Sequence, residues 1–333
     1  MTRENRTDLA RALIDEHPDA SSRALGKVLR ERYPGAFNSL DAARYAVRAA
    51  RGAAGPGKRA RIKPDKFTAW ALAMKAVEAR IPEETKHELV PYPIETGWRY
   101  LVLADAHIPE HSRLALETAI DFGVAQGCNA ILELGDMSEC KDTARFENEP
   151  GVTLAHEIRA RAEYMAYIRP KFKSGPYYSK MGNHEDNVRR YIIRNAPALV
   201  GLPCTQFEDI MPFANHGATV IESKTVIKAG KLDMIHGHEY RGGGGVNPAR
   251  WLHLRAGGCS VCGHFHRTST HTERRIDGFE VVTFSVGCLR TRDPDWCPLN
   301  QWNWGFAVLD LASDGDFEFR NYRILSRGVV VPG

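Results

Sequence analysis

The sequence predicts an α/β or α+β sandwich that is preceded by a small all-α domain. Two observations carry this prediction. Before residue 52, apolar residues recur at helical spacing in three short segments. From Trp98 onward, short apolar runs alternate with longer helical segments such as Ser112–Ala125 and Val152–Tyr167, which is typical of layered folds. The 333 residues are enough for one large domain and one small one.

The composition is that of an ordinary globular protein, with 43% hydrophobic and 26% charged residues. Met1–His17 contains no apolar run, and no segment reaches the ~18 apolar residues of a membrane span, so we expect neither a signal peptide nor a membrane partner. The seven cysteines are scattered, which favours a reducing cytoplasm over a disulfide framework. For Cys259 and Cys262, buried thiols are favoured over a zinc site, because no second cysteine pair completes one.

Residues 1–52 are expected to form three helices around one apolar seam. The apolar positions of these helices are Leu9, Leu13 and Ile14, then Leu25, Val28 and Leu29, then Leu40, Ala43, Val47 and Ala50. Either Asn38 or Ser39 is placed to cap the third helix.

The third helix carries Arg44, Arg48 and Arg51, whose spacings of four and three place them on one face. Residues 1–65 hold 14 Lys and Arg against 8 Asp and Glu, so the basic charge is concentrated here. Two interpretations stay open, a solvated basic face and a helix-turn-helix-like contact with DNA.

Residues 53–97 are expected to connect the two domains. Residues 52–64 are rich in glycine and basic residues and are typical of a flexible linker. A helix from about Lys66 to Arg80 is expected next, and several prolines then break the chain before the first strong strand. The second domain is expected to span residues 98–333.

Five predicted strands end in polar residues that are common metal ligands. The strands are Tyr100–Ala104, Ala130–Leu134, Tyr177–Met181, Leu232–Ile235 and Cys259–Cys262. The polar residues that follow them are Asp105, His107, Asp136, Asn183, His236, His264 and His266. Because strand ends in layered α/β folds gather at one edge, we expect these side chains to converge. Within the pairs Asp105/His107 and His264/His266, extended backbone would point both side chains the same way, and adjacent glycines would permit a close approach.

The seven side chains supply one amide, two carboxylates and four imidazoles, a donor set that suits Mn, Fe, Zn or Ni better than Ca or Mg. Seven ligands exceed the needs of one ion and suit two ions with a bridging carboxylate. Two ions ~3.5–4 Å apart lower the pKa of a bridging water and hold both oxygens of an in-line phosphoryl displacement. Any single histidine is more often structural, but five such strand ends in series are hard to explain by packing alone.

The series Asp-x-His, Gly-Asp, Gly-Asn-His-Glu, His and Gly-His-x-His, found here in this order between Trp98 and Asp310, resembles the calcineurin-like metallophosphoesterase superfamily. The resemblance implies a β-sandwich flanked by helices, with metals at the strand ends. It assigns one divalent ion to Asp105, His107, Asp136 and His266, and from the donor set we expect this ion to be Mn²⁺. It assigns a second ion to Asp136, Asn183, His236 and His264, with Asp136 as the bridge.

The same resemblance gives His184 the role of contacting the phosphate and protonating the leaving oxygen, and Glu185 the role of orienting its neighbours. The Arg of the protein phosphatase motif Gly-Asp-x-x-Asp-Arg-Gly is missing after Asp136. The segments 142–146 and 184–189 instead look like phosphoesterases of bacteriophages and prophages, which are often fused to a small helical domain. This implies the cytoplasm of a bacterial or phage-infected cell.

We therefore expect a two-metal phosphodiesterase or nuclease that acts on nucleic acid or nucleotides, with DNA or nucleotides as partners. A phosphomonoesterase and a DNA-binding protein with a vestigial enzyme domain are the alternatives. Arg189, His238, Arg241 and Arg267 are candidate substrate contacts, although each Arg also fits an ordinary surface residue. The Gly242–Gly245 run is expected to form a loop near the site.

Overall fold

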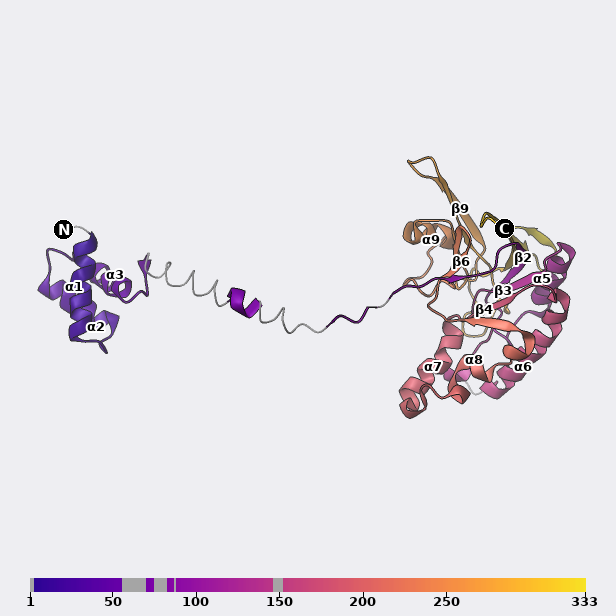
Figure 1. Ribbon diagram of the computed structural model, residues 1–333, viewed down its shortest axis with the longest axis horizontal. Helices are drawn as coiled ribbons and strands as arrows, with labels where there is room; N and C mark the ends of the chain where they lie inside the picture. Colours follow the sequence, from indigo (N-terminus) through magenta and orange to yellow (C-terminus); the bar gives the residue numbers. More distant parts are fainter. Residues whose placement is uncertain (1–2, 56–69, 75–82, 87, 146–151) are drawn as a thin grey trace. The chain divides into compact units, whose positions relative to one another are not determined.

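The computed structural model describes all residues except 1–2, 56–69, 75–82, 87 and 146–151. The chain divides into two compact units, Met1–His87 and Glu88–Gly333 (Figure 1). The division into residues 1–52, 53–97 and 98–333 stays a prediction. Most of the predicted linker at 52–64 lies outside the described residues. So does most of the helix expected from Lys66 to Arg80, of which residues 70–74 are described and are helical.

The N-terminal unit contains the three expected helices, α1 (Arg3–Glu16), α2 (Ser22–Arg32) and α3 (Leu40–Ala50). Ser39, not Asn38, caps α3, because its hydroxyl accepts a hydrogen bond from Ala42 N at 3.2 Å. The helices share a small apolar core. Its buried residues are Ala10, Leu13, Leu25, Leu29, Ala36, Phe37, Ala43, Ala46 and Val47.

Two sheets form the framework of the C-terminal unit. The seven-stranded sheet contains, in spatial order, β13 (Val330–Pro332), β12 (Phe317–Ile324), β11 (Trp304–Leu311), β2 (Trp98–Leu103), β3 (Ala130–Glu133), β4 (Tyr177–Lys180) and β5 (Ala218–Ile221). The six-stranded sheet contains β1 (Tyr92–Pro93), β6 (Ile227–Ala229), β7 (Leu232–Met234), β8 (Ser260–Cys262), β10 (Glu280–Ser285) and β9 (Ser269–Arg274). β2, β3, β4 and β5 run parallel, so their carboxyl ends meet at one edge.

Helices flank this pair of sheets (Figure 1). They are α5 (Arg113–Ala125), α6 (Leu154–Ile168), α7 (Asn183–Asn195), α8 (Phe207–Ile210) and α9 (Pro248–Ala256). Short 3₁₀ turns lie at Lys141–Thr143, Arg169–Phe172, Pro197–Leu199, Pro203–Thr205 and Ala214–His216. α6 begins two residues later than expected, because the Thr153 hydroxyl accepts from His156 N and caps the helix there.

The alternation of side chains along β2 shows how the layers are held together. Tyr100 and Val102 point into the core between the two sheets, where they join Met234 and Val261 of the six-stranded sheet. Leu101 and Leu103 point the other way, into a second core that is covered by helices such as α5 and α6. The strand is therefore apolar on both faces, as expected of a strand inside a covered sheet, and the predicted sandwich flanked by helices is confirmed.

All seven cysteines are free thiols. Cys262 is buried as expected, whereas Cys259 is only partly buried. No helix among the described residues combines the length and the hydropathy that crossing a bilayer requires.

Candidate metal centre

The side chains predicted to bind metal all follow the carboxyl ends of strands. The last strand residues are Leu103 in β2, Glu133 in β3, Lys180 in β4, Met234 in β7 and Cys262 in β8. The predicted ligands lie within four residues of these ends. They therefore come from both sheets, and they reach one place because the sheets are stacked with these ends on the same side.

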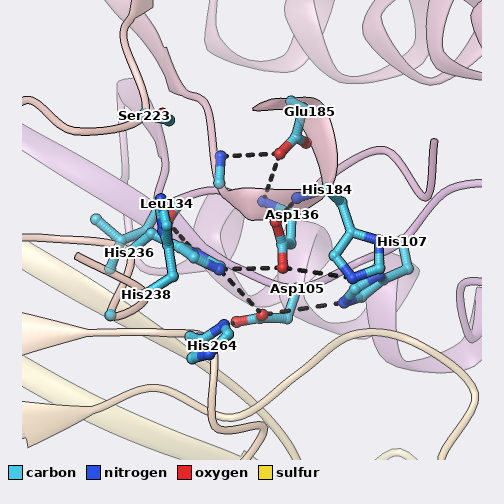
Figure 2. A network of polar contacts seen from close by, with 12 residues as sticks. Asp105, His107, Leu134, Asp136, His184, Glu185, Ser223, His236, His238 and His264 are labelled. Carbon is cyan, nitrogen blue, oxygen red and sulfur yellow. Dashed lines mark hydrogen bonds and ion pairs between the residues drawn. The ribbon is translucent and has the colours of Figure 1, made fainter. Parts of the chain in front are cut away.

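Six of the seven predicted ligands gather in two groups, and in each group the ligand atoms lie within 4.8 Å of one another. The groups are Asp105, His107 and His266, and Asp136, His236 and His264. They adjoin, because His236 Nε2 lies 3.0 Å from Asp136 Oδ2 and 4.0 Å from Asp105 Oδ1. Figure 2 shows the two carboxylates at the middle of the cluster.

Asn183, the seventh predicted ligand, lies in the first turn of α7, between two residues that touch Asp136. His184 N donates a hydrogen bond to Asp136 Oδ1 at 2.9 Å. Gly182 packs so closely that a Cβ at this position would lie 2.1 Å from the same oxygen. The structure therefore brings the backbone of Asn183 beside the second group.

Several buried atoms of these residues have no hydrogen-bond partner within the described part of the chain. Asn183 Oδ1 is one of them, and Asp105 Oδ1 and His236 Nε2 have only ion-pair contacts, with His266 Nε2 at 3.2 Å and with Asp136 Oδ2 at 3.0 Å. A buried polar atom without a partner costs about 1–3 kcal/mol, so folded proteins rarely keep several together. Oxygen and imidazole nitrogen atoms that share one enclosed place fit divalent cations, which would satisfy all of them.

The backbone at the site is strained. Six residues other than glycine have a positive φ among the described residues, and five of them are predicted ligands: Asp105 (53°), His107 (51°), Asp136 (51°), His264 (67°) and His266 (56°). Each such residue costs about 1–3 kcal/mol and is typically found at functional sites. The expectation that extended backbone pairs Asp105 with His107 and His264 with His266 is therefore wrong, because left-handed turns direct these side chains inward.

Hydrogen bonds fix which nitrogen two of the imidazoles present. His107 Nδ1 pairs with Glu139 Oε2 at 2.5 Å, and His236 Nδ1 donates to the carbonyl oxygen of Leu134 at 2.9 Å. Nε2 of each ring therefore faces the cluster. A carboxylate or carbonyl behind a ligating imidazole is the usual way in which proteins orient it.

The charges of the cluster are those of a cation site. Burial raises the pKa of Asp136, but the neighbouring His236 and His184 outweigh burial and hold it well below its usual value. Burial lowers the pKa of His236, but Asp136 and Asp105 raise it to about 10. Burial lowers the pKa of His264 to about 4, which keeps this ring neutral and able to bind a metal.

Two buried carboxylates that sequence reasoning did not place as ligands hold the loop after β3. Glu185 accepts from the backbone N–H groups of Gly182, Asp136 and Ser138 at 2.8, 3.0 and 2.9 Å. These bonds show how Glu185 could orient its neighbours, which is the role that the resemblance implies. Glu157 of α6 accepts from the N–H groups of Cys140 and Lys141 in the same loop. Burial raises the pKa of Glu185 and of Glu157 to about 7.

Sequence reasoning also missed Glu139 and Glu239. Glu239 accepts from the N–H groups of His236 and Gly237 at 3.1 and 2.7 Å, and Lys180 lies 3.0 Å from it. A common signal links these residues to Glu185, since each acidic residue lies three positions after Asp136, Gly182 or His236 at a strand end. For Glu185 and Glu239, that spacing brings the carboxylate back to the first N–H group of the turn. Glu139 pairs with His107 instead.

His184 lies beside the cluster and is a quarter exposed. Its Nδ1 donates to the carbonyl oxygen of Glu139 at 2.7 Å, and its Nε2 lies 3.9 Å from Asp136 Oδ2. Burial lowers the pKa of His184, but Asp136 and Glu139 outweigh burial and raise it. Nδ1 is therefore engaged by the backbone, and Nε2 is the ring nitrogen that faces Asp136.

The four candidate substrate residues are placed differently. His238 is nearly buried, with its ring centre 5.4 Å from that of His236, and burial lowers its pKa to about 4. Arg267 lies next to His266 in the sequence and lines a cleft with His264. Arg189 and Arg241 are exposed, and Arg189 lines a different pocket beside Glu185.

The cleft has a volume of about 450 Å³ and is lined by Gly243, Gly245, Val246, His264, Phe265, Arg267, Gln301 and Trp302. The Gly242–Gly245 run therefore does form a loop near the site. Arg267 donates to the carbonyl oxygen of Gly245 and to Gln301 Oε1, so it ties this loop to residues 301–302. The Trp302 ring packs edge-on against His266, with 4.4 Å between ring centres.

Comparison of the sequence with models of known protein families finds a match to one family. Residues 99–277 match the model of the calcineurin-like phosphoesterase family. Among curated proteins, no sequence matches this chain.

Solved structures with similar folds include a Vps29 single mutant from Entamoeba histolytica, at 15% identity, covering 71% of this chain and 97% of that chain with a TM-score of 0.38. Yfce, a phosphoesterase from E. coli, has 16% identity, covers 70% and 96% of the two chains, and has a TM-score of 0.35. A dimetal phosphatase from Danio rerio has 10% identity, covers 69% and 96%, and has a TM-score of 0.31. Similarities this low transfer no residue's role.

Proposed function

The chain belongs to the calcineurin-like phosphoesterase family, and on this premise we propose that it hydrolyses phosphodiester bonds in nucleic acid or nucleotides. The family and the clustered His, Asp and Glu residues indicate a binuclear divalent metal site. The observation that carries the proposal is the strained backbone of five predicted ligands, because strain is kept where a side chain must be presented in one direction.

We assign the seven side chains to two ions. Asp105, His107, Asp136 and His266 would hold one ion, and Asp136, Asn183, His236 and His264 would hold the other. Asp136 would bridge: it belongs to the second group, and its partner His236 also lies 4.0 Å from Asp105 Oδ1 of the first group. The mixed O and N donors suit Mn²⁺, with Fe, Zn or Ni as alternatives. When bound, such a pair activates a water and neutralises charge on the phosphate oxygens.

His184 would act as the general acid. Its Nδ1 is occupied by the Glu139 carbonyl, so the proton available to substrate is on Nε2. The nearby carboxylates that raise its pKa keep that proton in place. A positioned general acid contributes ~10²–10⁴ in rate. Glu139 also orients His107, so one residue supports both a ligand and the acid.

The cleft beside His264 supports a substrate that carries a nucleobase. Trp302 offers an aromatic surface on which a base can stack, and Arg267 can pair with a phosphate oxygen. Stacking is worth ~1–3 kcal/mol per base and accepts any base. A phosphomonoester of a small molecule would leave most of this cleft unused.

The test uses the purified full-length chain with Mn²⁺. We expect turnover of bis-p-nitrophenyl phosphate in excess of p-nitrophenyl phosphate, and cleavage of single-stranded DNA or RNA. Trp302→Ala should raise the KM for a dinucleotide about tenfold and leave the KM for bis-p-nitrophenyl phosphate nearly unchanged. Absence of turnover with all of these substrates, while the chain holds metal, would exclude the proposal. A preference for the monoester would favour a phosphomonoesterase.

A further inference from the structure

A second cluster of metal-binding residue types lies outside the strand-end centre. It consists of His253 on α9 and of His271 and Glu273 on β9, whose ligand atoms lie within 4.8 Å of one another. None of these residues belongs to either group at the strand ends. Figure 1 shows α9 beside the hairpin that β9 forms with β10.

His253 lies on the face of α9 that packs against the hairpin. Ala249, Leu252 and His253 are spaced three and four apart, so they share one side of the helix. Ala249 and Leu252 are fully buried, and the His253 side chain is only 14% exposed. Ala249 N donates to the Ser269 hydroxyl of β9 at 3.0 Å, and the Thr283 hydroxyl of β10 donates to the Ala249 carbonyl at 2.8 Å.

The two β9 residues face the same helix. Ser269, His271 and Glu273 alternate along the strand and therefore project from one face. Because Ser269 contacts α9, His271 and Glu273 lie on the α9 side as well. Antiparallel pairing with β10 fixes their register, with His271 opposite Thr283 and Glu273 opposite Val281.

The distances fit one shared ion better than hydrogen bonds alone. His253 Nε2 lies 2.6 Å from Glu273 Oε2, but His271 Nε2 lies 3.9 Å from the same oxygen, which is too long for a hydrogen bond. The two rings meet edge to face with their centres 4.9 Å apart, and the distances above relate the Nε2 atom of each ring to the same carboxylate oxygen. Ligand atoms around tetrahedral zinc lie about 3.3–3.5 Å apart, so shifts of under about 1.5 Å would complete the site.

We propose that His253, His271 and Glu273 bind a single transition-metal ion of the zinc type, separate from the ions of the strand-end centre. Two imidazoles and one carboxylate are a zinc donor set, and the Glu273 side chain is 59% exposed, which leaves room for water as a fourth ligand. The ion would join α9 to β9. In the sequence, these two elements flank β8 and residues 263–268, which include His264 and His266.

The experiment counts zinc in the full-length chain. Protein stripped with a chelator is dialysed against buffered Zn²⁺, and bound zinc per chain is measured by atomic emission. His253→Ala and His271→Ala should each hold one zinc ion fewer than the wild type, and Glu273→Gln should bind that ion at least tenfold more weakly. The difference of one ion does not depend on how many ions the strand-end centre holds, so the result is independent of the proposed hydrolysis.

His156→Ala is the matched control, because His156 is an exposed helix histidine outside all of these groups, and it should retain the full zinc content. The two histidine variants should also show wild-type hydrolysis of bis-p-nitrophenyl phosphate and unchanged far-UV circular dichroism, which reports an intact fold. Equal zinc content in wild type and His271→Ala would overturn the proposal. So would an equal loss in His156→Ala.

Discussion

The strand ends of the C-terminal unit and the basic surface of α3 were predicted by the same kind of reasoning, from residue type and spacing, and the structure treats them differently. At the strand ends, the predicted side chains meet in two adjoining groups. On α3, the three arginines separate. Arg51 caps the helix and donates to the carbonyl oxygens of Pro18 and Ala20 at 3.0 and 2.7 Å, so it serves the fold.

The other two arginines of α3 are not fixed in this way. Arg44 lies 3.6 Å from Asp41, and Arg48 is exposed. The difference shows when the spacing of residues in the sequence determines where their side chains lie in the fold. Parallel pairing carries the carboxyl ends of β2, β3 and β4 to one edge of their sheet, and those of β7 and β8 to one edge of theirs, whatever the sequence between them. A long arginine on a helix instead takes its partner from whichever loop lies nearby, and the spacing of residues does not encode that loop.

The largest expected effect is a loss of activity that tests whether the residues gathered at the strand ends form the reactive site. Asp136→Asn removes the negative charge shared by both groups, and we expect kcat/KM for bis-p-nitrophenyl phosphate to fall by at least about 10⁴-fold, with loss of bound metal measured by atomic emission. Asp142→Asn, an exposed carboxylate in the same loop, is the control and should change little. Near-normal activity of Asp136→Asn would mean that the strand ends do not form the reactive site.

The next effect separates the acid from the ligands. His184→Ala should keep both metals and slow cleavage of a dinucleotide by about 10²–10⁴. It should slow bis-p-nitrophenyl phosphate far less, because p-nitrophenolate leaves without needing a proton. Steady-state kinetics with both substrates, together with metal analysis, checks this. Loss of metal, or equal slowing of both substrates, would contradict the assigned role.

A smaller effect concerns pH and the loop after β3. The pKa of Glu157 is about 7 in the folded chain and near 4.5 when unfolded, so the folded state binds more protons between these values. The free energy of unfolding should therefore fall as pH rises from about 4.5 to 7, by roughly 1–3 kcal/mol, and then level off. Glu157→Gln should make this slope shallower but not abolish it, because burial also raises the pKa of Glu185 to about 7. Urea unfolding at pH 5, 6 and 7.5 would show the difference. A parallel slope in the variant would contradict the prediction.

The smallest expected effects are changes in stability caused by replacing arginines of α3, and they test whether these arginines differ as the structure indicates. Arg51→Ala should lower the free energy of unfolding of the N-terminal unit by about 1–2 kcal/mol, because it loses hydrogen bonds to two carbonyls. Arg48→Ala should leave stability within about 0.5 kcal/mol. If the unit binds DNA, Arg48→Ala should weaken binding at all sequences and lower the salt slope by about one.

Circular dichroism melts and gel shifts of full-length protein at two salt concentrations check both variants of α3. The reverse outcome, a stable Arg51→Ala with weakened DNA binding, would mean that the arginines form one functional face after all.

The sequence predicted the five strands of the site to within two residues at each end, because apolar runs followed by glycine and polar residues mark buried strand ends. The left-handed turns were not predictable from residue type, because Asp and His adopt both negative and positive values of φ. Nor were the contacts of Glu139 and Glu239, because those depend on loops packing side by side. Which ions bind, and the part that each side chain plays, stay predictions.

The left-handed backbone at five of the strand-end residues has a consequence for how such a protein can be improved. At each of these positions a glycine would adopt the left-handed backbone without strain but would remove a predicted metal ligand. Stability and the predicted metal binding therefore favour different residues at these positions. Selection for heat resistance alone would therefore replace these strand-end residues first, one by one, while leaving the two sheets intact.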